Sequence, residues 1–264
     1  MKAAFGRLFS IFPAMDFLSS GRRRCAALFA ATALLAAAGC ASVPPDSAAA
    51  AATSPWAGPA AWVHKTFPGK TATEFQYMRL DGRDVLAVRA DSSASMLRQA
   101  VRIAPADLGS VRFSWKVPGL IEQADLALRE RDDAPVRIVL AFEGDRSRFS
   151  ARDAALSELA RALTGEELPY ATLMYVWCNQ RPPGTVIPSP RTDRIRKLVV
   201  ESGPRRLNRW LDYERDIRAD YERVFGEPPG ALVGIAIMTD SDNTHTQAQA
   251  WYGPVRLVPA QHVQ

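Results

Sequence analysis

The sequence is poor in cysteine and histidine, with three residues of each among 264. The cysteines are Cys25, Cys40 and Cys178, too few and too scattered for the disulfide framework of a small secreted domain. The histidines lie far apart in the chain, which argues against a histidine-rich zinc site.

Common motifs of catalysis and nucleotide binding are also absent. The sequence has no G-x-S-x-G elbow, no G-x-G-x-x-G fingerprint and no H-E-x-x-H helix. Gly69-Lys70-Thr71 resembles the end of a phosphate-binding loop, but His64 stands where that loop needs a glycine. Motifs alone therefore assign no definite reaction.

The basic excess belongs to the N-terminal segment. The whole chain has a net charge of +5, from 33 basic and 28 acidic side chains. Residues 1–40 contain five basic side chains and one acid, which leaves 28 basic and 27 acidic groups and a net charge of +1 in the rest. We therefore expect no nucleic-acid partner.

Residues 1–40 have the pattern of a secretory signal. Three consecutive arginines precede an apolar run from Cys25 to Ala38, shorter than the roughly 20 residues that cross a bilayer. Because the segment before the arginines is unusually long, we expect translation to start at Met15 rather than at Met1.

The end of this run resembles the lipobox of bacterial lipoproteins. Ala38, Gly39 and Cys40 match it, whereas Ala37 stands where the pattern prefers leucine. The resemblance implies a lipid anchor on Cys40 and a place in the cell envelope, facing the periplasm. Ala41 then favours the outer membrane, by the sorting rule of enteric bacteria. The alternative is plain secretion to the periplasm.

Residues 41–61 are almost entirely Ala, Pro, Ser, Gly and Thr, which predicts a flexible tether with a mean reach of roughly 25 Å. We expect one folded domain over residues 62–264. Its composition is ordinary, because the chain has 47% hydrophobic and 23% charged residues.

Alternation of apolar and polar residues dominates the folded region. Residues 111–117 and 136–142 alternate, whereas 172–178 and 232–238 are apolar on both faces, as central strands are. Further strands are predicted at 74–80, 84–90, 97–103, 194–201 and 249–258.

Two segments have helical spacing instead. Ser150 caps the first, and Gly165 ends it. Its apolar stripe consists of Leu156, Leu159, Ala160 and Leu163. The second contains Ile217 and Tyr221 and ends before Gly226. Because strands do not alternate regularly with helices, we predict an all-β fold: an antiparallel β-sandwich of jelly-roll type with two helical insertions.

A polar cluster follows the strand at 232–238. Asp240, Asp242 and Asn243 offer oxygens that suit Ca²⁺ or the hydroxyl groups of a sugar. The alternative is an Asx-turn loop whose side chains satisfy their own backbone.

A second polar cluster, Asp132 and Asp133, precedes the strand that carries Arg137. Adjacent carboxylates suit a cation or acid–base work, although a solvated turn is the structural alternative. If both turns lie at one end of the sandwich, Asp133 and Asp240 share a single pocket.

Arg215 and the aromatic residues are further candidates. Arg215 or Arg137 is expected to orient the acids, although Asp216 has the simpler role of a helix cap. We expect Trp115 to fill the core. Trp177 and Trp210 are expected to be more exposed, and Trp177 is a candidate platform for a sugar ring.

Several stretches together resemble an uncharacterised bacterial envelope family, domain-of-unknown-function family 3047. They include residues 113–117, 131–139, 168–177 and 234–244, and the resemblance covers about residues 74–258. It implies no activity. Its patterns are similar to the jelly rolls of carbohydrate-binding modules, which is an analogy of fold only.

Three functions stay open at this point. The first is a non-catalytic envelope lipoprotein that binds a glycan or another polar ligand. The second is an enzyme that acts on an envelope polysaccharide through an acidic pair such as Asp133 and Asp240. The third is a structural or partner-binding envelope protein, which an exposed apolar patch would favour.

Overall fold

The structure of the protein is a computed structural model that describes residues 62–260. The predicted signal segment, the start at Met15, the lipidated Cys40 and the tether at 41–61 lie outside the described residues. Within residues 62–260, no helix has the length and apolar character needed to span a membrane.

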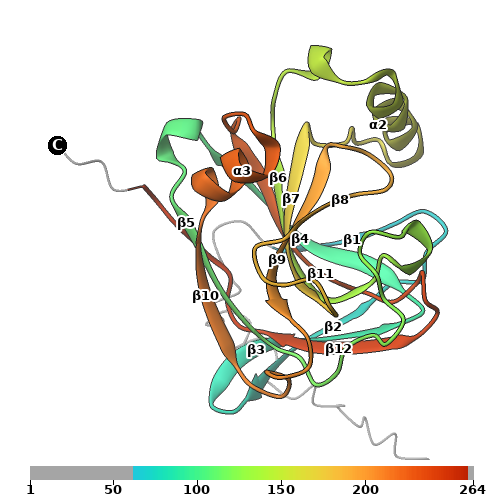
Figure 1. Ribbon diagram of the computed structural model, residues 1–264, viewed down its shortest axis with the longest axis vertical. Coiled ribbons are helices and arrows are strands. Elements are labelled where there is room, and N and C mark those ends of the chain that lie inside the picture. Colours follow the sequence, from blue (N-terminus) through green and yellow to red (C-terminus); the bar gives the residue numbers. More distant parts are fainter. Residues whose placement is uncertain (1–61, 261–264) are drawn as a thin grey trace, which may run out of the picture. The chain divides into compact units, whose positions relative to one another are not determined.

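The described chain is mostly β-structure, arranged in two sheets (Figure 1). The first sheet has seven strands, and all neighbours are antiparallel except the parallel pair β7 and β9. In spatial order these strands are β1 (Val63–Thr66), β4 (Ala94–Ile103), β11 (Leu232–Asp240), β6 (Ala134–Phe142), β7 (Ala171–Cys178), β9 (Ile195–Ser202) and β8 (Val186–Pro188).

The second sheet is antiparallel throughout. Its strands are, in spatial order, β10 (Leu211–Asp216), β5 (Ser110–Lys116), β12 (Gln247–Tyr252), β3 (Arg83–Asp91) and β2 (Glu74–Leu80), with β13 (Arg256–Val258) also paired to β5. A largely antiparallel, two-sheet fold is thus confirmed, while the jelly-roll arrangement stays a prediction.

Every predicted strand is present, and residues 74–80 form β2 with the predicted bounds. The predicted strand at 249–258 is divided in two, because Gly253 and Pro254 interrupt it between β12 and β13. The strands β1, β8 and β10 were not predicted. The first two have only four and three residues, too few for a clear alternation.

The core lies between the sheets, where alternate side chains of facing strands meet. On β5, Val111, Phe113 and Trp115 are buried, and the Phe113 ring stacks on Tyr175 of β7 with 5.8 Å between centroids. Trp115 thus occupies the core as predicted. Cys178, at the end of β7, is a buried free thiol.

The two predicted helices are α2 (Ala151–Thr164) and α3 (Ile217–Phe225). The hydroxyl of Ser150 accepts the amide N–H of Asp153 at 3.1 Å and caps α2, and Gly165 ends it in the left-handed region at φ +76°. On α3, Ile217, Tyr221 and Val224 pack into the core.

The apolar stripe of α2 does not face the core, which corrects the expectation from its spacing. Leu159 and Leu163 are 54% and 61% exposed, whereas Asp153 and Ser157 are buried. The reason is that polar contacts hold α2 to the domain. Asp153 accepts a hydrogen bond from the hydroxyl of Thr192, and the hydroxyl of Ser157 accepts one from the guanidinium of Arg146 at 2.9 Å.

Candidate functional site

The two predicted acidic turns lie together, because β11 ends beside the start of β6. Asp240 on β11 pairs directly with Ala134 on β6. As a result, Asp133, Asp240 and Asp242 each present a carboxylate oxygen within 4.8 Å of the others. The predicted convergence of Asp133 and Asp240 is confirmed.

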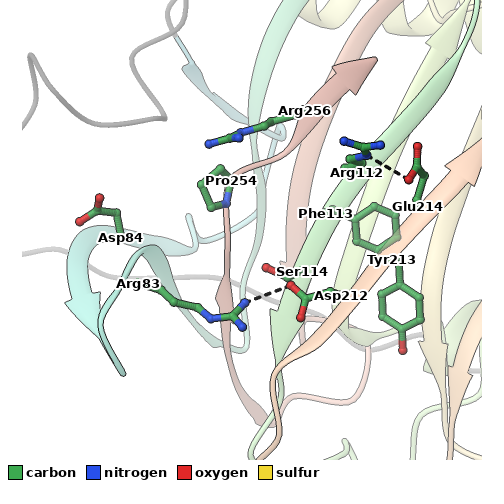
Figure 2. A pocket seen from close by; sticks show the side chains of 10 residues that line it. All are labelled: Arg83, Asp84, Arg112, Phe113, Ser114, Asp212, Tyr213, Glu214, Pro254 and Arg256. Atoms are coloured by element: carbon green, nitrogen blue, oxygen red, sulfur yellow. Dashed lines mark hydrogen bonds and ion pairs between the residues drawn. The ribbon is translucent and has the colours of Figure 1, made fainter. Parts of the chain in front are cut away.

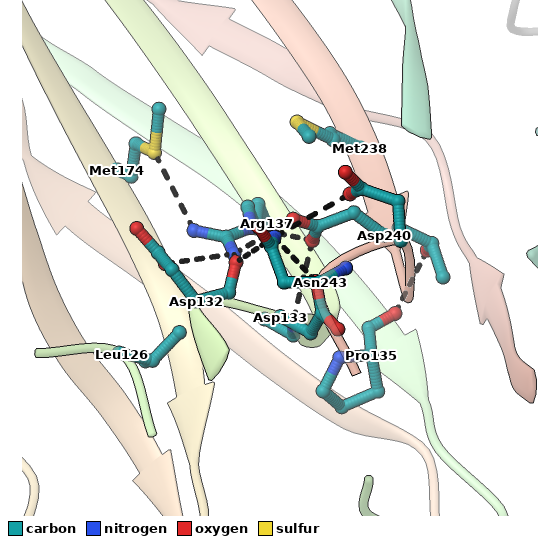
Figure 3. Close-up of polar contacts among 12 residues, drawn as sticks. Leu126, Asp132, Asp133, Pro135, Arg137, Met174, Met238, Asp240 and Asn243 are labelled. Carbon is teal, nitrogen blue, oxygen red and sulfur yellow. Dashed lines mark hydrogen bonds and ion pairs between the residues drawn. The ribbon is translucent and has the colours of Figure 1, made fainter. Parts of the chain in front are cut away.

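Arg137 lies at the centre of this cluster and is almost fully buried (Figure 3). Its Nε donates to Oδ1 of Asp240 at 2.7 Å, and its Nη2 donates to Oδ2 of the same carboxylate at 2.9 Å. The Nη2 also reaches Oδ1 of Asp132 at 3.1 Å. One guanidinium therefore bridges the turn before β6 and the end of β11.

Lys197 on β9 is a second buried cation, which the sequence analysis missed. Its Nζ donates to Oδ2 of Asp132 at 2.6 Å and to the carbonyl of Leu126 at 2.7 Å. Burial, together with the neighbouring Arg137, lowers its pKa to about 8. The available signal was a lysine that shares one face of its strand with Val199 and directly precedes three apolar residues.

Asp133 organises the loop after β11. Its Oδ2 accepts the amide of Thr244 at 2.7 Å and the hydroxyl of the same residue at 2.6 Å. Its Oδ1 accepts the side-chain amide of Asn243 at 2.8 Å. This carboxylate is thus buried and holds the loop after β11, so the solvated turn that was the alternative for Asp133 is wrong.

The cluster contains one more acid than base. Asp132, Asp133, Asp240 and Asp242 face Arg137, Lys197 and Lys70, whose ammonium pairs with Asp242. Burial raises the pKa of Asp240 to about 7, and repulsion from Asp133 and Asp132 adds to this, against the attraction of Arg137.

A Ca²⁺ ion at Asp133, Asp240 and Asp242 stays a prediction. Ca²⁺ takes six to eight oxygen ligands. All three carboxylates already pair with groups of the chain itself, namely Thr244, Arg137 and Lys70. Asp133 and Asp240 are also almost fully buried. A substrate would have to displace the internal partner of each carboxylate.

Two of the predicted site residues lie away from the cluster. Trp177 is only 1% exposed, within the core between the sheets, and its Nε1 donates to the carbonyl of Gly203 at 3.1 Å. The expectation of an exposed ring for sugar stacking is therefore wrong. Arg215 instead pairs with Asp220 and lies over the ring of Tyr175, which joins β10 to α3.

A groove on the outer face of the second sheet is the more open site (Figure 2). It has a volume of about 680 Å³. Its lining residues come from β3, β5, β10, β13 and the turn before β13: Arg83, Asp84, Arg112, Phe113, Ser114, Asp212, Tyr213, Glu214, Pro254 and Arg256.

Ion pairs hold the arginines of this groove. Arg83 donates to Asp212 at 3.0 Å, and Arg112 pairs with Glu214 at 3.0 Å. Arg256 lies opposite Arg112 in the strand register, and its guanidinium makes no hydrogen bond or ion pair within residues 62–260. The groove thus presents one free guanidinium beside two paired ones.

A strip of tryptophan and charged side chains extends from the groove along the same face. The guanidinium of Arg83 lies over the Trp210 ring, 5.1 Å from its centroid, and the indole N–H of Trp210 donates to Asp81 at 3.0 Å. Lys116 also donates to Asp81, at 2.8 Å, and lies over the Trp251 ring. Both indoles are partly exposed, as expected for Trp210.

The sequence matches the family described as "Protein of unknown function (DUF3047)" over residues 60–256. The chain belongs to this family. The match includes β1 to β12, and therefore both the buried cluster and the tryptophan strip. Among curated proteins, no sequence matches the chain.

Solved structures resemble the chain only remotely. The xyloglucanase domain of NopAA, a type three effector from Sinorhizobium fredii in complex with cellobiose, aligns with a TM-score of 0.39 and 9% identity, over 75% of this chain and 93% of that one. A mutant of the ENZbleach xylanase aligns with a TM-score of 0.32 and 8% identity, over 76% and 85%. At this level, neither likeness carries an argument about function.

The buried cluster predicts an unusual pH dependence of stability. Asp240 has a raised pKa, so the folded state binds its proton more tightly than the unfolded state, where the ordinary value is 3.8. The stability that this group contributes is therefore complete below pH 3.8 and is lost as the pH rises toward 7. Asp240→Asn removes the titration. The variant lacks the charged partner of Arg137 and is less stable for that reason, but its free energy of unfolding relative to wild type should rise by about 2–3 kcal/mol from pH 5 to pH 8.

Urea unfolding at several pH values measures this difference. Asp212→Asn, at a largely exposed carboxylate, is the matched control and should follow wild type throughout. A constant difference between Asp240→Asn and wild type over this range would show that Asp240 is ionised in the folded protein at pH 5.

Proposed function

We propose that the protein is a lipid-anchored, non-catalytic component of the bacterial cell envelope whose β-domain binds a glycan. The observation that carries this proposal is the groove on the second sheet together with the strip of Trp210 and Trp251 beside it. A jelly-roll arrangement, as in carbohydrate-binding modules, is part of the proposal.

The chemistry of this face suits a sugar. Indole rings offer flat apolar surfaces for the CH faces of sugar rings, and their partial exposure leaves area to cover. Carboxylates such as Asp81 accept hydrogen bonds from hydroxyls, and Arg256 donates. The volume of about 680 Å³ lies in the ordinary range of ligand pockets.

The pairs Arg83–Asp212 and Arg112–Glu214 also fix the polar groups before a ligand arrives. Side chains held by such contacts lose less rotational freedom on binding than free ones do. All these groups lie on or between paired strands of one sheet, so the face is held by the backbone ladder.

The buried cluster has a supporting part in this proposal. Arg137, Asp132 and Asp240 join strands and turns of the first sheet, and Asp133 holds the loop with Asn243. Direct contact between a ligand and Asp242 or Asn243, which lie at the margin of the cluster, stays a prediction.

A glycan array probed with the chain from Ala41 onward tests the binding. We expect retention of at least one envelope polysaccharide, and a loss of affinity of about tenfold or more in the double variant Trp210→Ala, Trp251→Ala, because stacking area is removed. Tyr77→Ala, at an exposed aromatic residue outside the groove and the strip, is the matched control.

The absence of any retained glycan at high protein concentration would contradict the proposal, and so would equal binding by the double variant. Asp242→Asn tests the buried cluster in the same assay. If this variant alone loses binding, the ligand lies at the acidic turns and the tryptophan strip is not the site.

Labelling with palmitate tests the anchor. We expect label in the wild-type protein and none in Cys40→Ser, because this thiol is the proposed attachment point. Cys178→Ser is the matched control and should keep the label, since its thiol is buried. Label that persists in Cys40→Ser would refute the lipobox, and an unlabelled wild-type protein would indicate plain secretion.

A further inference from the structure

The outward face of α2 has an exposed apolar stripe, which the exposed side chains of Arg152 and Glu158 flank. Figure 1 shows α2 standing outside the two sheets. Four side chains on this face are exposed: Ala155, Leu159, Ala162 and Leu163. Their spacing of three, four and seven residues places them on one side of a helix.

The opposite face of α2 is the polar one. Asp153 and Ser157 are buried against the domain and bonded to Thr192 and Arg146. A surface helix normally has the reverse arrangement, with its apolar side toward the core. This orientation leaves two leucines in water and buries a carboxylate, and an apolar phase outside the domain would cover the leucines.

We propose that the outward face of α2 lies on the lipid surface to which Cys40 is anchored. This inference rests on the proposed lipid anchor for its choice of membrane. The two leucines and two alanines enter the boundary between headgroups and acyl chains, with the helix axis in the plane of the membrane.

The point where the chain enters the domain supports this occupant. The predicted tether ends at residue 61, and β1 starts at Val63. Glu166, two residues after the end of α2, accepts Lys65 of β1 at 2.6 Å and Arg98 of β4 at 2.6 Å. The end of α2 is thus bonded to β1, the strand that starts two residues after the predicted tether, so this helix lies near the point where the chain enters the domain.

The size of the face argues against a second copy of the chain. A helix of 14 residues is about 21 Å long, and one side of it offers roughly 200 Å². A stable protein interface takes about 800 Å² from each partner. A single shallow stripe is too small for that, whereas an interfacial helix needs only such a stripe.

Another exposed apolar residue, Val63, lies on the strand to which the end of α2 is bonded. Val63 is exposed on β1, two residues before Lys65, which donates to Glu166. Arg152 and Arg161 on α2 are also exposed, and their guanidinium groups donate to the carbonyl of Pro190 and to Glu158.

Vesicle sedimentation tests the inference without the anchor. All described strands and helices lie within residues 62–260, so the chain from Ala41 onward contains the whole folded domain and lacks Cys40. We expect this chain to bind vesicles of phosphatidylethanolamine and phosphatidylglycerol at millimolar lipid. Leu159→Asp with Leu163→Asp should weaken the binding by about tenfold or more.

Leu128→Asp, at an exposed leucine away from α2, is the matched control and should bind as wild type does. Thermal unfolding should be unchanged in all variants, since the three leucines are exposed. Equal vesicle binding by the α2 double variant, or no binding by the unmodified chain, overturns the inference.

Sedimentation velocity without lipid tests whether a second copy of the chain binds the outward face of α2. A dimer that the double variant converts to a monomer would assign the face to a second copy and also overturn the inference. The palmitate experiment is separate: loss of the anchor alone leaves the vesicle result intact, so the two proposals fail independently.

Discussion

The buried guanidinium of Arg137 is the constraint around which one side of the fold is arranged. An unpaired charge in this position would cost several kcal/mol. Its donors are met by Asp240 at the end of β11 and by Asp132 in the turn before β6. Segments that are about 100 residues apart in the sequence are thereby joined, and removing one partner should cost about 3–5 kcal/mol.

This arrangement also decides which surfaces are available. Lys197 reaches the carbonyl of Leu126, so the segment before β6 covers the cluster on the outer side of the first sheet. The corresponding side of the second sheet carries the groove and the tryptophan strip. Internal ion pairs thus fill the outer side of the first sheet around Arg137, whereas the outer side of the second sheet carries the open groove.

The helix α2 has its polar side toward the domain and its leucines toward solvent, the reverse of a usual surface helix. Its polar side binds the domain through Asp153 and Ser157, and its leucines point outward. The proposed glycan-binding face belongs to the second sheet, whereas Glu166 bonds the end of α2 to β1 and β4 of the first sheet. A domain that contacts lipid through α2 would therefore use a different element for its glycan.

The sequence by itself determined most of the strands and both helices, whereas the meeting of Asp133 with Asp240 was a hypothesis that the strand pairing of β6 with β11 confirmed. Alternation and capping residues such as Ser150 and Gly165 are local patterns, which can be recognised in the sequence alone. The resemblance to the family also covered nearly the whole folded region.

Only the tertiary structure decided the surroundings of single side chains. Both faces of β7 are apolar, so nothing in the sequence distinguished a buried Trp177 from an exposed one. Spacing likewise could not tell which side of α2 faces the domain. The groove could not be predicted, because its residues come from β3, β5, β10, β13 and the turn before β13. Pairing of strands that are far apart in the sequence brings these residues together, and local patterns do not report such pairing.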